Sequence, residues 1–194
     1  GPAIFLAGRS RVGKTLTGLA LAERGYRLLQ MDRFRTFYYA PKLKYALLPD
    51  VQDLRIRLYA RLAGAGRDLV IEGTDVMFFL QAGGTLPPEN PLFYLGIRKE
   101  DVELKARQIH DRLLQAAELS ADQVLPTALK RARIMAEHSE RLRREAAKGG
   151  NRHFIDMMCA GGDMLQSALA AASRIDALVR AGRGESAPAP TPPR

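Results

Sequence analysis

Short apolar runs alternate with longer stretches of helical periodicity along most of this chain. Five apolar runs predict buried strands, at residues 3–7, 26–31, 68–72, 92–97 and 153–157. Apolar positions spaced three and four residues apart predict helices over about 14–24, 50–63, 100–117, 121–148 and 163–181. Because strands alternate with helices, we expect an α/β fold with a mainly parallel five-stranded sheet.

The pattern ends before the chain does. Residues 3–181 are expected to form one domain, since their apolar runs and helices are continuous. Residues 182–194 read GRGESAPAPTPPR, which is rich in proline and almost without large apolar side chains. Such a composition cannot bury a core, so residues 182–194 are predicted to be a disordered tail.

The turn after the first strand carries the strongest motif. GRSRVGKT, from Gly8 to Thr15, matches G-x-x-x-x-G-K-S/T at every fixed position, after an apolar strand and before a helix. The glycines let backbone N–H groups converge on phosphate oxygens, and the helix start adds partial positive charge. Lys14 would reach the β- and γ-phosphates, and the Thr15 hydroxyl would be a ligand of Mg²⁺. The residues expected to bind the nucleotide are Gly8, Arg9, Ser10, Arg11, Val12, Gly13, Lys14, Thr15 and Leu16.

Two large classes of P-loop protein fit poorly. A GTPase would need D-x-x-G after a strand and N-K-x-D for guanine, and neither is suitably placed in this sequence. Motor and AAA-type ATPases usually end an apolar strand in Asp or Asp-Glu, whereas the comparable stretch, residues 69–73, reads LVIEG. A strand that ends in Glu-Gly favours a small kinase.

The second predicted strand leads into QMDRFR, which places Asp32 at its carboxyl end. In an open α/β sheet this edge faces the ligand crevice. A carboxylate there can take a proton from an attacking hydroxyl, and Arg35 could hold an anion of the substrate. Asp32 could instead cap the next helix, which is a common role for aspartate.

The third predicted strand ends at Glu72, which should emerge beside the P-loop strand. Glu72 could hold Mg²⁺ through a water molecule or polarise the acceptor, so we predict a catalytic role for it together with Lys14 and Asp32. Gly73 and Thr74 would allow close approach of the substrate. The alternative is that Glu72 pairs with a neighbouring basic residue.

In this order and spacing, GRSRVGKT, MDRFR and VIEG resemble the P-loop small-molecule kinases of the adenylate, nucleoside and shikimate kinase type. The resemblance implies a three-layer P-loop NTPase fold with a five-stranded parallel sheet and a helical lid after the fourth strand. It implies ATP and Mg²⁺ as cofactors, places Asp32 and Arg35 near the acceptor, and assigns lid arginines to residues 98–144. The segment FRTFYYAPKLKYALLP, residues 34–49, matches no substrate-specific pattern.

Charge and composition narrow the partners. Residues 1–67 hold 13 basic and 4 acidic residues and carry the whole net charge of +9, because the remainder holds 17 of each. A positive field around the P-loop would attract phosphate-bearing ligands, although an arginine-rich surface explains the charge equally well. The single cysteine, Cys159, fits a reducing cytoplasm, and no apolar run is long enough for a membrane helix.

The remaining polar candidates are weaker. His110, His138 and His153 lack metal-ligand spacing, so we expect them to be structural. The run Arg141, Arg143 and Arg144 is expected to be a solvated helix face, from which one member could reach the nucleotide.

Three functions are compatible with these patterns. The first is an ATP-dependent kinase acting on a small hydroxyl- or phosphate-bearing acceptor. The second is a polynucleotide or nucleotide kinase in which the basic first third follows a phosphate backbone. The third is a non-catalytic ATP-dependent switch whose tail or charged helices bind a partner.

Overall fold

A five-stranded, all-parallel sheet organises the chain. The computed structural model describes residues 1–33, 49–117, 119–158 and 163–186. Its strands are β1 (Ile4–Ala7), β2 (Arg27–Gln30), β3 (Leu69–Glu72), β4 (Leu92–Gly96) and β5 (Arg152–Asp156). They lie in the order β2-β3-β1-β4-β5, and each pair of neighbours is parallel. The predicted five-stranded parallel sheet is confirmed.

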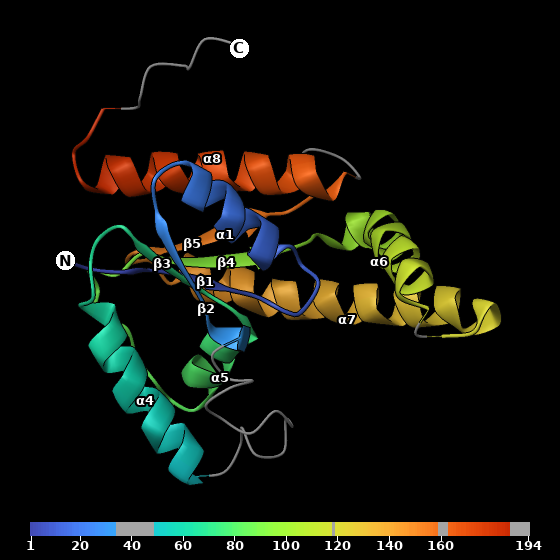
Figure 1. Cartoon of the computed structure of the whole chain (residues 1–194), viewed down its shortest axis with the longest axis horizontal. Coiled ribbons are helices and arrows are strands. Elements are labelled where there is room, and N and C mark those ends of the chain that lie inside the picture. The colour runs from blue at the N-terminus through green and yellow to red at the C-terminus, as the bar shows by residue number, and fades with distance from the viewer. Residues whose placement is uncertain (34–48, 118, 159–162, 187–194) are drawn as a thin grey trace.

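Helices cover both faces of the sheet (Figure 1). The helices α1 (Lys14–Glu23) and α8 (Met164–Gly182) lie on one face. The opposite face is covered by α4 (Pro49–Ala63), α5 (Thr74–Gln81) and α7 (Ala121–Ala147). The core divides in the same way, because alternate strand residues point to opposite faces. Ile4 and Leu6 belong to the core cluster under α1 and α8, whereas Phe5 belongs to the cluster under α4 and α5.

A helical hairpin follows β4, where the helical lid is expected. A short 3-10 turn (Lys99–Asp101) leads into α6 (Val102–Ala116), which pairs with α7. In Figure 1 the hairpin extends beyond the edge of the sheet. Its two helices share a small core of their own, formed by Ala106, Ile109, Leu113, Val124, Ala128 and Ala132.

The helix α5 was not among the predicted elements. It begins directly after Gly73, and its residue Asp75 is fully buried against α4. There Asp75 accepts hydrogen bonds from Arg55 (3.1 Å) and Tyr59 (3.1 Å). Since both charges of this ion pair are buried, loss of either partner would leave an uncompensated charge in the core. The pair therefore fixes α5 and, with it, the neighbouring Thr74.

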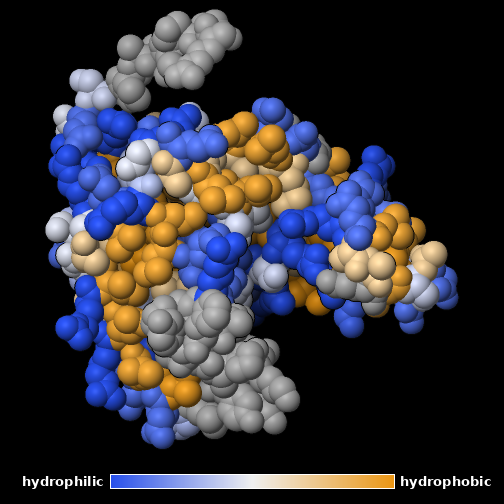
Figure 2. Space-filling model, in the orientation of Figure 1, coloured by the Kyte–Doolittle hydropathy of each residue, from blue (hydrophilic) through white to orange (hydrophobic). Residues whose placement is uncertain are grey.

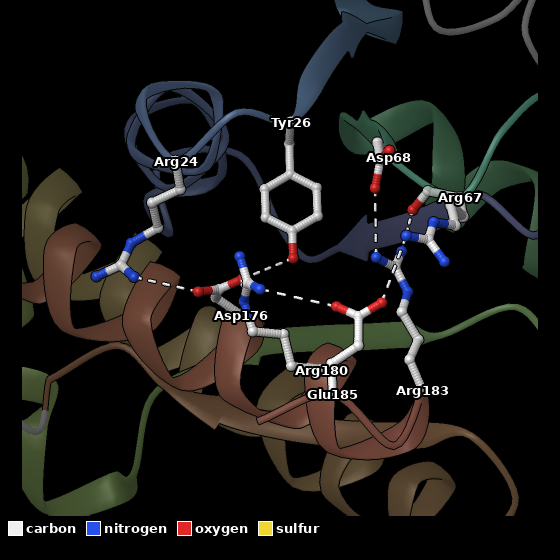
Figure 3. A network of polar contacts seen from close by, with 8 residues as sticks. All are labelled: Arg24, Tyr26, Arg67, Asp68, Asp176, Arg180, Arg183 and Glu185. Atoms are coloured by element: carbon white, nitrogen blue, oxygen red, sulfur yellow. Dashed lines mark hydrogen bonds and ion pairs between the residues drawn. The ribbon is translucent and has the colours of Figure 1, made fainter. Parts of the chain in front are cut away.

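The end of α8 is fixed by a network of ion pairs (Figure 3). Asp176 accepts hydrogen bonds from Tyr26 (2.7 Å) and Arg180 (3.0 Å). Beyond the helix, Arg183 lies 3.3 Å from Asp68, and Glu185 pairs with Arg67 and Arg180. The chain thus keeps contact with the domain past residue 181, the predicted boundary, and α8 itself includes Gly182. Residues 187–194 lie outside the described residues.

Apolar side chains also reach the surface. Figure 2 shows apolar surface over the α1 and α8 layer, where Leu19, Leu165 and Leu169 are exposed. Within the described residues, no helix combines the length and the apolar character that a membrane span requires.

Candidate functional site: a P-loop and its cavity

The turn between β1 and α1 is shaped by glycine. Gly8 has a φ of +158° and Gly13 a φ of +116°, in the region that favours glycine. A Cβ atom at Gly8 would lie 2.7 Å from the carbonyl oxygen of Leu95, so only glycine fits there. Val12 is buried and anchors the middle of the turn in the core. The sequence motif therefore folds into a rigid loop that ends at the start of α1.

Lys14, the first residue of α1, is buried beside two carboxylates. Its side chain is 5% exposed, and its Nζ donates a hydrogen bond to the Arg9 carbonyl oxygen at 2.6 Å. Burial lowers the pKa of Lys14 to about 8, and the charges of Asp32 and Glu72 partly oppose this shift. Any negative charge brought near the ammonium group therefore stabilises its charged form, which suits a residue that binds phosphates.

Glu72, at the end of β3, lies next to the start of α1. It is 2% exposed, and burial raises its pKa, opposed by the positive charge of Lys14. The side chains of Gln30 and Thr15 donate hydrogen bonds that also favour its ionised form. Glu72 consequently connects the ends of two strands with the Thr15 hydroxyl, the side chain predicted to bind Mg²⁺.

Asp32 follows β2 and meets the start of α5. Its Oδ1 accepts a hydrogen bond from the backbone N–H of Thr74 at 3.0 Å. Gly73 makes this approach possible, since a Cβ there would lie 3.0 Å from the same oxygen, and its φ is +146°. Asp32 thus has a structural partner on α5, and it also lines the main cavity. Arg35, its predicted companion, lies outside the described residues.

The main cavity, of about 740 Å³, opens beside the P-loop and Asp32. Arg131 of α7 adds a positive charge to its wall. The complete lining comprises Gly8, Arg9, Ser10, Arg11, Asp32, Thr74, Met77, Phe78, Gln81, Ile109, Arg131, Ile134, Met135 and His138. Nine of these fourteen residues come from α5, α6 and α7, and of the nine only Thr74 was predicted to bind the substrate.

Only some of the residues considered in the sequence analysis line this cavity. Gly13, Lys14, Thr15 and Leu16 belong to the loop and helix behind the cavity and are absent from its lining. His153 stacks on Phe93, as a structural histidine would. His138, also expected to be structural, instead lines the cavity. The position of His138 at the cavity could not be predicted from the sequence, because tertiary packing decides which face of α7 points inward.

The arginine run on α7 divides in two. Arg143 pairs with Glu140 at 3.2 Å and lies over the ring of Phe154, as a helix-surface residue would. Arg141 lines a second cavity next to the first. The aromatic and basic residues of the segment after Asp32, from Tyr38 to Tyr45, and Cys159 lie outside the described residues.

The residues present fit a bound nucleoside triphosphate and a divalent cation. Gly8 lets the turn pass close to the Leu95 carbonyl oxygen of β4, and Lys14 lies at the end of the turn. Thr15 and Glu72 supply a hydroxyl and a carboxylate, the hard oxygen ligands that suit Mg²⁺ or its bound water. Within the described residues, no cluster of three or more histidine, cysteine or acidic side chains forms a separate metal site.

Comparison with solved structures finds small-molecule kinases. Shikimate kinase from Acinetobacter baumannii, solved with shikimate, matches with a TM-score of 0.50 and 19% identity over 94% of both chains. Shikimate kinase from Aquifex aeolicus has a TM-score of 0.43 and 10% identity over 95% of this chain and 99% of its own. A gluconokinase from Sinorhizobium meliloti has a TM-score of 0.39 and 16% identity over 90% and 93%. No family model and no curated protein matches the sequence.

Proposed function

We propose that this chain is an ATP- and Mg²⁺-dependent kinase that phosphorylates a small acceptor bearing a hydroxyl or phosphate group. Its fold is that of the P-loop small-molecule kinases. The observation that supports this most is the convergence of Lys14, Asp32 and Glu72. The charges of both carboxylates act on the Lys14 ammonium, so the start of α1 and the ends of β2 and β3 bring the three groups together beside the cavity that Asp32 lines.

Each residue has a distinct role in this proposal. ATP supplies the phosphoryl group, and Mg²⁺ neutralises phosphate charge and bridges its oxygens. The backbone of residues 8–13 and the Lys14 ammonium bind the phosphates and hold the γ-phosphoryl group in place. Thr15 would hold the cation, and Glu72 would orient the Thr15 hydroxyl and fix a water of the cation. Because Glu72 is buried and does not line the cavity, we assign it to the cation rather than to the acceptor.

Asp32 is the residue best placed to meet the acceptor. Its hydrogen bond from Thr74 holds the carboxylate in one orientation at the cavity wall. A carboxylate so held could receive the proton of an attacking hydroxyl or orient that hydroxyl beside the γ-phosphate. Gly73 and Thr74 leave room for the acceptor to approach, and Arg35 stays a substrate-binding prediction.

The alternatives make different predictions. A polynucleotide kinase would bind oligonucleotides with a steep dependence on salt, because phosphate contacts release counterions. An ATP-dependent switch would change its affinity for a partner with nucleotide and phosphorylate nothing. A cytoplasmic location stays a prediction, since it rests on Cys159.

A metabolite pool incubated with γ-labelled ATP and the purified chain tests the proposal. We expect one labelled small molecule to appear with the parent protein and not with Lys14→Ala. ATP turnover should also rise when that acceptor is added. Labelling of oligonucleotide ends alone would favour the polynucleotide kinase, and absence of any labelled product would favour the switch.

A further inference from the structure

A second cavity adjoins the first along the helix α7. It has a volume of about 450 Å³ and lies between α5 and α7. The two cavities share Arg9, Met77, Gln81 and His138. Because four residues belong to both walls, the cavities are neighbouring parts of one hollow that begins at the P-loop.

One face of α7 lines the whole hollow. Arg131 borders the first cavity, Arg141 borders the second, and His138 borders both. The rise of an α-helix is about 1.5 Å per residue, so Arg131 and Arg141 are separated by about 15 Å along the axis. This length exceeds what a small ring needs beside the γ-phosphate, and it leaves room for a longer acceptor.

The second cavity is rich in positive charge. Arg9, Arg141 and Arg152 line it, against the single carboxylate of Glu145. Glu145 already pairs with Lys148 at 2.6 Å and with Arg152 at 3.6 Å. Arg141, in contrast, is exposed and has no ion-pair partner in the part of the chain that the structure describes. An anion would therefore find a guanidinium group that no carboxylate neutralises.

His138 lies where the two cavities meet, and the positive charges of the second cavity act on it. Its side chain is 7% exposed, and its Nδ1 is buried without a hydrogen-bond partner among the described residues. The pKa of His138 is lowered to about 4, mainly by burial and additionally by the positive charges of Arg9 and Arg141. Both guanidinium groups thus act on one position, where a neutral imidazole can still hydrogen-bond to a ligand oxygen.

We propose that the second cavity is a subsite for an anionic group at the far end of the acceptor, a phosphate or a carboxylate, bound by Arg141 and Arg9. This inference rests on the proposed function, because it assigns the anion to the acceptor of that reaction. Arg141 is then a residue that determines specificity, and acceptors with a distant anionic group are favoured over neutral ones.

Anion binding by four proteins tests the subsite. Inorganic phosphate and, separately, malonate are titrated into the parent and into Arg141→Gln, Arg144→Gln and Lys14→Ala by calorimetry. Arg144 is the matched control, since it is an exposed arginine of the same helix that lines neither cavity. Loss of a charged hydrogen bond should weaken the second site by about tenfold or more in Arg141→Gln. Arg144→Gln should bind both anions like the parent. The parent, Arg141→Gln and Arg144→Gln should have equal melting temperatures.

The outcomes separate the two proposals. Selective weakening for phosphate or for malonate supports the subsite and identifies its anion. Equal binding of both ions by Arg141→Gln and Arg144→Gln overturns it. Lys14→Ala should lose anion binding at the P-loop and keep it at the subsite. Unchanged binding at the P-loop in Lys14→Ala would count against the P-loop assignment and would not affect the subsite. Once the acceptor is known, Arg141→Gln should raise its KM about tenfold at unchanged kcat. An unchanged KM would overturn the assignment of this subsite to the acceptor.

Discussion

The Lys14 ammonium, at the start of α1, and the Glu72 carboxylate, at the end of β3, are buried next to each other, and each stabilises the charged form of the other. The positive charge of Lys14 lowers the pKa of Glu72, while the negative charge of Glu72 raises that of Lys14. Burial works against both charges and is the larger influence on each pKa. Such a pair is costly to the fold and is explained by a site that binds a highly charged ligand.

Asp32→Asn should retain ATP binding and lose most transfer to the acceptor. Asparagine keeps the shape and can still accept the hydrogen bond from Thr74, but it cannot take a proton. Loss of general-base assistance typically lowers a rate by about 10²–10⁴-fold. Turnover and ATP-induced thermal stabilisation measure the two effects. Asp53→Asn, at an exposed position of α4, is the control. Near-parental turnover of Asp32→Asn would reduce Asp32 to a structural partner of Thr74.

Lys105→Met should stabilise the fold at pH 7. Lys105 is 1% exposed on α6, and burial lowers its pKa from 10.5 to about 8, aided by the charges of Arg112 and Lys14. Since the unfolded chain binds more protons between these two values, the stability of the parent rises as the pH increases from about 8 to 10.5. The shift corresponds to a cost on the order of 3 kcal/mol at pH 7.

Chemical denaturation at several pH values measures this cost. The advantage of Lys105→Met should be largest at or below pH 7 and should shrink toward zero by about pH 10.5. Lys99→Met, at an exposed position, should show no such dependence. A parent more stable than Lys105→Met at pH 7 would mean that the hydrogen bond from the Lys105 ammonium to Gln108 Oε1, at 3.0 Å, compensates the cost of its burial.

Two truncations distinguish the end of the domain from the tail. Removal of residues 187–194 should leave the melting temperature unchanged, because their composition cannot bury a core. Removal of residues 182–194 also deletes Arg183 and Glu185, which bind Asp68 and Arg67. Exposed ion pairs contribute up to about 1 kcal/mol in total, so we expect a decrease of about 2–4 °C. Equal melting temperatures of the two truncations would show that these pairs contribute nothing.

The P-loop and the sheet could be predicted because their signals are local. Residues 3–15 contain an apolar strand, a glycine turn and a Lys-Thr pair in immediate succession, and each has one favoured conformation. The order of the strands was not predicted, because it depends on pairing between distant segments and not on any local pattern. The helix α5 escaped prediction because buried positions occur around most of its short length, including Asp75, so no polar stripe marks it.

The far wall of the site could not be predicted for a different reason. The helix α7 has 27 residues and carries many arginines, and nothing in its sequence states that Arg131, His138 and Arg141 face the cavities. That orientation follows from its packing on β4, β5 and α6. Likewise, Arg183 and Glu185 belong to a polar segment whose composition suggests disorder, and only their distant partners hold them in place.

The central claim is that the turn from Gly8 to Thr15 binds ATP and directs its γ-phosphoryl group to a small acceptor. Its most direct test is the transfer of label from γ-labelled ATP to a metabolite pool by the parent and by Lys14→Ala, with Lys99→Ala as the control at an exposed lysine. We predict one labelled small molecule with the parent and with Lys99→Ala, and none with Lys14→Ala. Equal labelling by Lys14→Ala, or no labelled small molecule with any of the three proteins, would contradict the claim.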